Sequence, residues 1–379
     1  MSLYGIAAIP ALIWLYLWLG RGQFWRVAAQ RGPLLTPAAD RHVVVLIPAR
    51  NEAPVIGTAV ASLAQQVFNG LIHIIVIDDG SSDGTAEAAL QAARHAGVLA
   101  RFTLLRSDKL PPGWTGKLWA LSQGVAAAAA RKPDYFLFSD ADICHGPLSV
   151  ASLVADAEAN ERDLVSHMVK LSTVTLAERL LIPAFVFFFF KLYPPAWVAA
   201  PQRKLAAAAG GCMLIRPAAL ARAGGLSAIR SQIIDDCALA RAIKAFGGRI
   251  ALELAADSRS LRRYASWAEI GTMISRSAFA QLRHSYLLVA ATLLGMFLTY
   301  LLPVCLLFVG APLLVGSGLA ALLLMSSCYL PMVRFYGLSP LWSLSLPLTA
   351  IFYIGAVVHS AVQHARGRGG VWKGRVQDA

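Results

Sequence analysis

Uncharged apolar stretches stand near both ends of the chain. Residues 1–20 contain no charged side chain, and the run from Leu3 to Leu19 approaches the roughly 17–25 residues that a helix needs to span hydrocarbon. Arginines follow this run within residues 21–39, whereas a cleaved signal peptide carries its positive charge before the apolar core. We therefore expect residues 1–20 to be a retained membrane anchor, followed by a basic linker that faces the cytoplasm.

The C-terminal part of the chain holds a second set of apolar stretches. Ser285 to Val333 contains no charged residue, and this length accommodates two helices of roughly 20 residues each. We expect membrane helices at 286–309, 312–333 and 341–362, because buried core helices of a soluble protein rarely have uncharged stretches this long. The basic tail, residues 363–379, prefers the cytoplasmic side, although three spans after a cytoplasmic domain place it outside. Either one span is miscounted or one segment is re-entrant.

A shorter apolar segment, Leu180 to Phe190, lies in the middle of the chain. It is interrupted by Pro183 and followed by Lys191, and we expect it to be too short to span a bilayer. Two interpretations stay open for it. It is either a core helix, or an interfacial helix that lies on the membrane and borders the entry for a lipid.

Residues 40–285 hold nearly all the acidic side chains and alternate between two hydrophobic patterns. Apolar runs predict strands at 42–47, 72–77, 102–105 and 135–139, and the segments between them predict helices at 52–66, 84–96 and 117–130. Such alternation is typical of an open α/β sheet with parallel strands, whose ligands bind at the carboxyl ends of the strands. We therefore expect an α/β domain whose site lies in the loops that follow these strands.

The composition supports a membrane protein with a polar domain inside it. Hydrophobic residues make up 57% of the 379 residues and charged residues 15%, against roughly 25% in an ordinary soluble domain. The net charge of 34 − 21 = +13 suggests nucleic acid in a soluble protein, but membrane flanks in a chain this apolar. Because no basic motif is interleaved with aromatic residues, we expect the membrane and no nucleic acid as a partner. The five cysteines follow no disulfide or metal-binding spacing.

Polar loops follow the first two predicted strands. Asn51 and Glu52 come after the first strand, in a turn whose backbone N–H groups either hold a polar ligand or simply begin a helix. Asp78 and Asp79 end the second strand, where adjacent carboxylates can accept hydrogen bonds from ribose hydroxyls or base N–H groups. Asp83 is a candidate helix cap in the same loop. We therefore expect this loop to serve both structure and function.

Two further groups of acids follow. The fourth strand runs into Asp140 and Asp142, which can face one cleft and offer hard oxygen ligands to Mg²⁺ or Mn²⁺, as needed to clamp a diphosphate. Lys117 opens the preceding helix and can reach a phosphate, but its GWTGK run lacks the spacing of a P-loop, which excludes that reading. Asp235 and Asp236 begin a later helix, where they are either a helix cap or the source of a general base.

Taken in order, these residues belong to six short motifs spread over about residues 42–285. The motifs are IPARNE, IDDGSSDGT, GWTGKLWAL, FSDAD, GGCMLI and IDDCALARAI. This ordered set resembles the family 2 glycosyltransferases, which are inverting enzymes with a Rossmann-like GT-A fold. With an anchor before the domain and spans after it, the chain looks most similar to the hopanoid-biosynthesis-associated glycosyltransferases of bacteria.

The resemblance implies a role for each matching residue. The implied nucleotide-sugar contacts are Ala49, Asn51, Glu52, Asp79, Lys117, Asp140, Gly210 and Gly211. Asp142 and Asp140 are the implied ligands of a divalent cofactor, Mg²⁺ or Mn²⁺. Asp236 stands where the family has its catalytic base, with Asp235 beside it. The two glycines match the loop beneath the donor sugar, where small residues allow close approach.

The resemblance also implies a reaction and a place. The expected reaction moves a sugar from a nucleotide-diphospho-sugar to the hydroxyl of a lipid, in the hopanoid context, at the cytoplasmic face of the bacterial inner membrane. Processive members carry a QxxRW motif after the base, whereas this chain has no such string and offers Arg276 and the run Gln281-Leu282-Arg283-His284 in the nearest region. A processive polysaccharide synthase therefore stays a weaker alternative. A non-enzymatic transporter or scaffold is another, although a transporter would carry polar residues within its spans.

Overall fold

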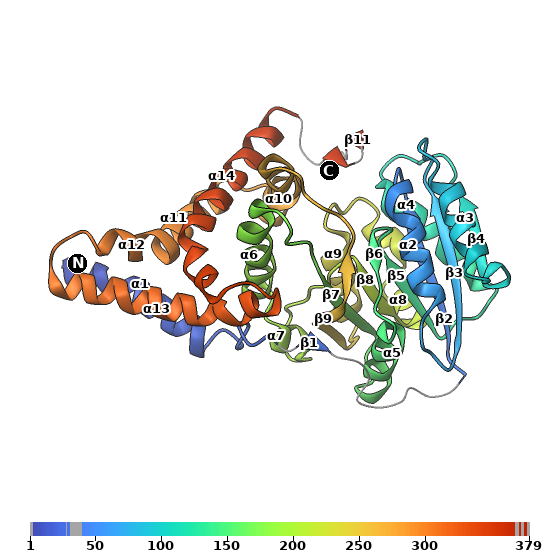
Figure 1. Cartoon of the computed structure of the whole chain (residues 1–379), viewed down its shortest axis with the longest axis horizontal. Coiled ribbons are helices and arrows are strands. Elements are labelled where there is room, and N and C mark those ends of the chain that lie inside the picture. Colours follow the sequence, from blue (N-terminus) through green and yellow to red (C-terminus); the bar gives the residue numbers. More distant parts are fainter. Residues whose placement is uncertain (1–2, 28, 31–39, 368–370, 373–374, 377–379) are drawn as a thin grey trace. The chain divides into compact units, whose positions relative to one another are not determined.

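The structure is a computed structural model that describes residues 3–27, 29–30, 40–367, 371–372 and 375–376. The chain folds as two compact units, each assembled from separated stretches of sequence (Figure 1). The sheet unit comprises the described residues within 28–172, 197–262 and 372–379. The helical unit comprises those within 1–27, 173–196 and 263–371. All the candidate site residues belong to the sheet unit.

The sheet unit is built around a β-sheet with the strand order β1-β9-β7-β8-β5-β2-β3-β4. The strands expected from the sequence are β2 (His42–Ala49), β3 (Leu71–Asp78), β4 (Phe102–Arg106) and β5 (Tyr135–Ser139), and they pair in parallel as expected. Val43 to Ile47 are fully buried. Helices cover both faces of the sheet at β2, which explains why this strand is apolar throughout and does not alternate between apolar and polar residues.

The other half of the sheet departs from the expected parallel arrangement. β8 (Cys212–Ile215) runs antiparallel to both β5 and β7 (Leu164–Lys170), while β9 (Ile250–Ser260) is parallel to β7. The short strands β1 (Ala29–Gln30) and β6 (Ile143–Cys144) both pair with β9. The expectation of a parallel sheet is therefore wrong at β8. A buried apolar run such as CMLI has the same pattern in either direction, so periodicity did not reveal its orientation.

The helices of the sheet unit lie close to the predicted ranges. α2 (Ala53–Ala64), α3 (Thr85–His95) and α4 (Gly116–Ala129) each begin and end within two residues of the expected bounds and surround the parallel strands (Figure 1). Gly124 of α4 lies where a Cβ would come 2.9 Å from Ile77, so this glycine allows α4 to pack closely on the sheet. The remaining helices are α5 (Ser149–Ala159), α8 (Pro217–Arg222) and α9 (Asp235–Ala245).

The helical unit contains the apolar helices. They are α1 (Leu3–Leu19), α6 (Leu176–Leu192), α10 (Trp267–Gln281), α11 (Tyr286–Met296), α12 (Leu302–Leu306), α13 (Pro312–Phe335) and α14 (Leu346–Ala365), and α7 (Pro195–Ala199) lies at the boundary of the two units. A π-helical turn, Phe297–Leu301, joins α11 to α12. α1 packs along α13 and α10 packs along α14 (Figure 1).

Four helical segments among the described residues are long and apolar enough to cross a membrane. Tyr286–Leu306, Pro312–Phe335 and Pro340–Ala365 confirm the three C-terminal helices expected from the sequence. The fourth, Leu176–Ala199, corrects the expectation that the central segment is too short. The N-terminal helix α1 has 17 residues and falls below this length, so its role as an anchor stays a prediction.

The central segment is longer than expected because α6 begins before Leu180 and continues through Pro183, and because the segment also includes α7. α6 begins at a capping box, in which the Thr175 hydroxyl accepts a hydrogen bond from Glu178 N (3.2 Å) and the Glu178 carboxylate accepts one from Thr175 N (2.9 Å). Within the helical unit, the ring of Phe187 meets that of Tyr329 with centroids 5.0 Å apart. Packing and capping therefore outweigh the local effect of the proline.

Candidate active site

The register of the parallel strands brings the polar loops to one edge of the sheet. Ala49 lies opposite Asp78, Asp78 lies opposite Arg106, and Leu46 lies opposite Phe138. The segments that follow β2, β3, β4 and β5 therefore leave the sheet side by side. This is the edge at which open α/β sheets bind ligands.

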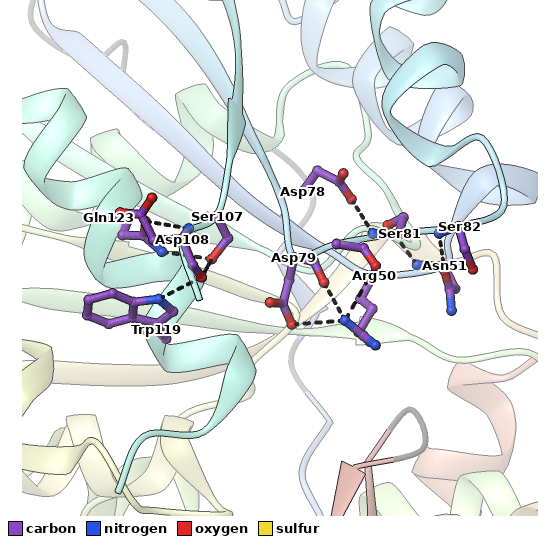
Figure 2. Close-up of polar contacts among 11 residues, drawn as sticks. Arg50, Asn51, Asp78, Asp79, Ser81, Ser82, Ser107, Asp108, Trp119 and Gln123 are labelled. Atoms are coloured by element: carbon purple, nitrogen blue, oxygen red, sulfur yellow. Dashed lines mark hydrogen bonds and ion pairs between the residues drawn. The ribbon is translucent and has the colours of Figure 1, made fainter. Parts of the chain in front are cut away.

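The loops after β2 and β3 are hydrogen-bonded to each other (Figure 2). Asn51 N donates to Ser81 Oγ at 3.0 Å, and Asn51 Oδ1 accepts from Ser82 N at 3.0 Å. Asn51 has a φ of +51°, a conformation that asparagine adopts more readily than most residues. Asp79 N donates to Ala49 O at 2.8 Å. The structure thus joins Ala49, Asn51 and Asp79 in one double loop.

Arg50 was not identified from the sequence, yet it contacts the loop after β3 (Figure 2). Its Nη1 donates to Asp79 O at 2.5 Å and lies 3.9 Å from the Asp79 carboxylate, whose side chain is 6% exposed. Glu52 stands at the N-cap of α2, and its backbone N donates to Thr85 Oγ1 at 2.8 Å. The arginine was missed because its contact partner lies 29 positions away in the chain.

The loop after β4 was also missed. Ser107 N donates to Asp78 O at 2.8 Å, and Gln123 of α4 donates to Ser107 Oγ at 2.7 Å and accepts from Asp108 N at 2.9 Å (Figure 2). Trp119 Nε1 donates to Asp108 O at 3.1 Å. The rule used for the other strands, that polar residues after a strand are site candidates, would have found Ser107 and Asp108 as well.

A second group joins Lys117 to three of the predicted aspartates. Lys117 Nζ lies 2.8 Å from Asp140 Oδ1 and 3.4 Å from Asp235 Oδ2. Asp236 accepts two backbone hydrogen bonds, from Gly210 N at 2.9 Å and from Cys237 N at 2.7 Å. The end of β5, the start of α4, the start of α9 and the loop before β8 therefore meet at one point.

The two glycines before β8 have little space around them. A Cβ on Gly210 would come 3.2 Å from Lys117 Nζ and 3.3 Å from Asp236 Oδ2. A Cβ on Gly211 would come 3.3 Å from Ile143 Cδ1. A side chain at either position would press on these neighbours. The role of the two glycines beneath the donor sugar stays a prediction.

The charges in this group alter one another's protonation. Burial, and then the Asp235 carboxylate, raise the pKa of Asp236 to about 6, against the opposing effect of Lys117. Burial also raises the pKa of Asp140 above its ordinary value, although Lys117 opposes this. For Lys117, burial acts to lower the pKa, but Asp140 and Asp235 outweigh it and hold the pKa above its usual value. A carboxylate with a pKa near 6 is charged at neutral pH and well suited to take a proton.

Asp142, the second residue of the predicted metal pair, is held by the end of β9. Its Oδ2 accepts a hydrogen bond from Ser260 Oγ at 2.8 Å, and its backbone O accepts one from Leu261 N at 2.7 Å. Both hydrogen bonds come from residues more than a hundred positions along the chain, so no local pattern predicted them. These two hydrogen bonds hold both the side chain and the backbone of Asp142 in place at the edge of the sheet.

The acids at this edge fit a particular kind of metal site. Carboxylate oxygens of Asp140 and Asp142 are the hard donors that Mg²⁺ and Mn²⁺ prefer. Among the described residues, no group of three or more His, Cys, Asp or Glu side chains is arranged to hold a metal ion. A closed structural site is therefore not formed by this part of the chain. The two carboxylates fit a cation that takes its remaining ligands from water and from substrate phosphates.

Comparison with known proteins supports a family for this domain. Residues 44–223 match the model described as Glycosyl transferase family 2. The glucosyl-3-phosphoglycerate synthase of Mycolicibacterium paratuberculosis is 31% identical over 131 residues, which cover 34% of this chain and 36% of that protein. An N-acetylglucosaminyltransferase of Rhizobium leguminosarum bv. viciae is 33% identical over 125 residues, which cover 31% of this chain and 27% of that protein. The chain thus matches well under half the length of either relative.

A solved structure extends the likeness to most of the chain. The mannosyltransferase PcManGT from Pyrobaculum calidifontis, in complex with GDP-Man and Mn²⁺, has a TM-score of 0.57 and 19% sequence identity, covering 95% of this chain and 99% of that chain. At this identity the likeness shows a shared fold. Residues 44–223 therefore match a glycosyl transferase family 2 domain, and the chain shares the Rossmann-like GT-A fold of this mannosyltransferase.

Proposed function

We propose that this chain transfers a sugar from a nucleotide-diphospho-sugar to the hydroxyl of a membrane lipid, with inversion at the anomeric carbon. The observation that carries the proposal is the group around Asp236. A carboxylate with a raised pKa is held by two backbone N–H groups, beside a lysine that also contacts the first aspartate of the predicted metal pair. A general base and a diphosphate site within one cluster are what a glycosyl transfer requires.

The donor is proposed to lie along the edge of the sheet. Ala49, Asn51, Glu52 and Asp79 hold the nucleoside, while Asp140 and Asp142 face the ribose and diphosphate. A divalent ion, Mg²⁺ or Mn²⁺, would be held by Asp142 together with Asp140, and when bound it offsets negative charge on the leaving diphosphate. PcManGT, which shares the fold, binds GDP-Man and Mn²⁺. That likeness supports a metal-assisted nucleotide-sugar site in this chain.

The proposed chemical step uses Asp236 as the base. Asp236 takes the proton from the acceptor hydroxyl as the hydroxyl oxygen forms a bond to the anomeric carbon. The bond from that carbon to the diphosphate oxygen breaks on the opposite face, so the configuration inverts and the nucleoside diphosphate leaves. The sugar is proposed to approach the cluster beside Gly210 and Gly211, which carry no side chain, and Lys117 faces the departing negative charge.

The lipid acceptor is proposed from the apolar helices. A transferase with several helices of membrane-spanning length acts where a membrane lipid is its most accessible acceptor. We place the chain in the bacterial inner membrane as a multi-pass protein, with residues 1–20 as an anchor and the catalytic domain on the cytoplasmic side. A hopanoid-related lipid is the acceptor that the sequence resemblance favours.

The position of α6 in the chain restricts how Leu176–Ala199 meets the membrane. β7 precedes this segment and β8 follows it, and these two strands are hydrogen-bonded neighbours in one sheet. A single crossing between them would place the two strands on opposite sides of the bilayer, which their pairing forbids. Leu176–Ala199 therefore begins and ends on one side, a condition that a core helix and an interfacial helix both meet. We propose the interfacial interpretation, with a lipid entry near this segment.

The test is a transfer assay with the full chain in lipid nanodiscs. Purified protein is given Mn²⁺, a bacterial lipid extract and, one at a time, UDP- and GDP-linked sugars. We expect the release of nucleoside diphosphate to depend on lipid, and one glycolipid with a single sugar of inverted configuration to form. A polymeric product would favour the processive synthase instead. Lipid-independent release, or no transfer with any donor, would overturn the proposal.

A further inference from the structure

Lys117 occupies a position that its own helix does not favour. It is the second residue of α4, whose N-terminus carries a partial positive charge from the aligned peptide dipoles. A cation at this end is unfavourable for the helix. The Lys117 side chain is nevertheless only 20% exposed and is held by contacts with acids outside the helix. Its place is therefore explained by those acids and not by the stability of α4.

The ammonium group of Lys117 bridges two motifs that come from distant parts of the chain. Its Nζ lies 2.8 Å from Asp140, at the end of β5, and 3.4 Å from Asp235, at the start of α9. The Cβ that Gly210 lacks would lie 3.2 Å from this Nζ and 3.3 Å from Asp236 Oδ2. The absence of a side chain at residue 210 thus leaves Lys117 room to reach the acids on both sides.

This arrangement places a positive charge where a metal ion would have to approach. Asp140 Oδ1 already contacts Nζ at hydrogen-bond distance, so one carboxylate of the predicted metal pair is neutralised before any cation arrives. A divalent ion beside Asp140 and Asp142 would be repelled by the ammonium group a few ångströms away. A bound nucleoside diphosphate changes this repulsion into a favourable arrangement, because its negative charge attracts both the Lys117 ammonium group and the divalent ion.

We propose that Lys117 is an internal counter-cation that makes metal binding depend on the donor: it weakens metal binding to the empty site by holding Asp140, and strengthens it once a diphosphate is bound. The second half of this inference rests on the proposed function. The first half concerns only Lys117, Asp140 and a metal ion. A merely structural role for Lys117 would shift metal affinity in the same direction with and without nucleotide.

The experiment measures Mn²⁺ affinity by electron paramagnetic resonance, on the full chain and without turnover. Wild type, Lys117→Met and Lys117→Arg are titrated with Mn²⁺ alone and with saturating UDP or GDP. Without nucleotide, Lys117→Met is expected to bind Mn²⁺ about tenfold more tightly than wild type, and Lys117→Arg to bind like wild type. With nucleoside diphosphate, Lys117→Met is expected to bind Mn²⁺ about tenfold more weakly than wild type.

A matched control removes a lysine that is exposed and lies outside the cluster. Lys132, which follows α4, serves this purpose, and Lys132→Met is expected to bind Mn²⁺ like wild type in both conditions. If Lys117→Met does not fold, the double variant Lys117→Met with Asp235→Asn removes one charge of each sign. It is then compared with Asp235→Asn alone, and tighter Mn²⁺ binding by the double variant without nucleotide is the expected result.

Equal or weaker Mn²⁺ binding by Lys117→Met without nucleotide overturns the inference, and so does that result for the double variant. If neither UDP nor GDP changes the Mn²⁺ affinity of any variant, the proposed donor site fails. The titration without nucleotide still decides whether Lys117 competes with the metal, so the two failures are distinguishable.

Discussion

Two regions at the same sheet edge each hold a hydrogen-bonded aspartate, and they shift the pKa of that aspartate in opposite directions. Asp83, in the loop after β3, accepts hydrogen bonds from Ala53 N at 3.0 Å and from Thr85 N at 3.1 Å. Burial acts to raise the pKa of Asp83, but the hydrogen bonds from Thr85 and Ala53 outweigh it and hold the pKa below its ordinary value. Asp236 also accepts two backbone hydrogen bonds, yet burial and the adjacent Asp235 raise its pKa to about 6.

The difference separates an acid that organises a loop from one that is prepared to react. The Asp83 carboxylate is stabilised in its charged form, so it is a weak base. Its hydrogen bonds instead hold the loop in place. The Asp236 carboxylate is destabilised in its charged form, so it gains more from taking a proton. We infer that the loop after β3 mainly shapes the nucleoside end, and that the chemistry belongs to the cluster around Lys117.

A third acid shows that a raised pKa alone does not mark a reactive group. Burial and then Glu253 raise the pKa of Asp156 to about 6, as for Asp236. Asp156 lies on α5 and pairs with Arg162 at 3.0 Å, in an ion network with Glu253 and away from the loops that follow β2 to β5. The position at the carboxyl ends of the strands, together with Lys117 and the paired acids, distinguishes Asp236.

The largest effect is expected from Asp236→Asn. Turnover should fall by about a thousandfold, because the amide cannot take the acceptor's proton, while donor affinity changes little. Transfer assays and calorimetric donor titration separate the two quantities. If Asp236→Asn keeps more than a tenth of wild-type turnover, another residue must be the base.

The same variant is expected to be more stable above pH 6. Because the folded pKa of Asp236 is raised to about 6, its ionisation opposes folding. This cost is absent below the unfolded value of about 4 and complete above the folded value. Thermal melting at pH 8 should therefore be higher for Asp236→Asn, by roughly 2–4 °C for each kcal/mol recovered.

The next largest effect is expected from Asp142→Ala. The Mn²⁺ concentration that gives half-maximal activity should rise by about a hundredfold, because the metal loses a direct carboxylate ligand. The measurement is a Mn²⁺ titration of the transfer rate at saturating donor. An unchanged dependence of the rate on Mn²⁺ would show that Asp142 is not a metal ligand. It would also contradict the proposal that Asp140 and Asp142 hold the metal ion.

A smaller effect is expected from Ser260→Ala. This change removes the hydroxyl that donates to Asp142 Oδ2, so Mn²⁺ affinity should fall by about tenfold while kcat at saturating Mn²⁺ stays close to wild type. Ser260→Thr keeps a hydroxyl and should restore the affinity. Ser227, whose hydroxyl donates to Gly224 O in an exposed turn, supplies the control variant Ser227→Ala.

The smallest effect on turnover is expected from Asp83→Ala. The loss of hydrogen bonds to Ala53 and Thr85 should lower the free energy of unfolding by about 1 kcal/mol, as for a lost helix cap. Turnover at saturating donor should stay within about twofold of wild type, since the carboxylate is not part of the reacting group. A large loss of kcat with unchanged stability would show that Asp83 takes part in the reaction, and would contradict the distinction drawn between Asp83 and Asp236.

The sequence predicts best what depends on local pattern. The strands β2, β3 and β5 are mostly buried and read as apolar runs, while β4, at the edge of the sheet, is partly exposed. The acids that follow these strands are visible from spacing alone. The three C-terminal helices are apolar over long uncharged stretches, so length was sufficient to find them. The assignment of roles to the individual site residues remains a proposal.

What the sequence did not predict depends on contacts between distant residues. The contact of Lys117 with Asp235, the hydrogen bond from Ser260 to Asp142 and the contact of Arg50 with Asp79 all join separate segments. The antiparallel direction of β8 and the passage of α6 through Pro183 are likewise decided by packing. Arg368 and Lys373 of the basic tail lie outside the described residues.

The pH dependence of kcat/KM for the acceptor tests most directly whether Asp236 is the base. The wild type is expected to lose about tenfold in rate for each pH unit below about 6 and to be level above it. Asp235→Asn should move this midpoint to lower pH, because the Asp235 charge raises the Asp236 pKa, whereas Asp83→Ala should leave it in place. A wild-type profile that is level from about pH 5 to about pH 8, or a midpoint that Asp235→Asn does not move, would contradict the account.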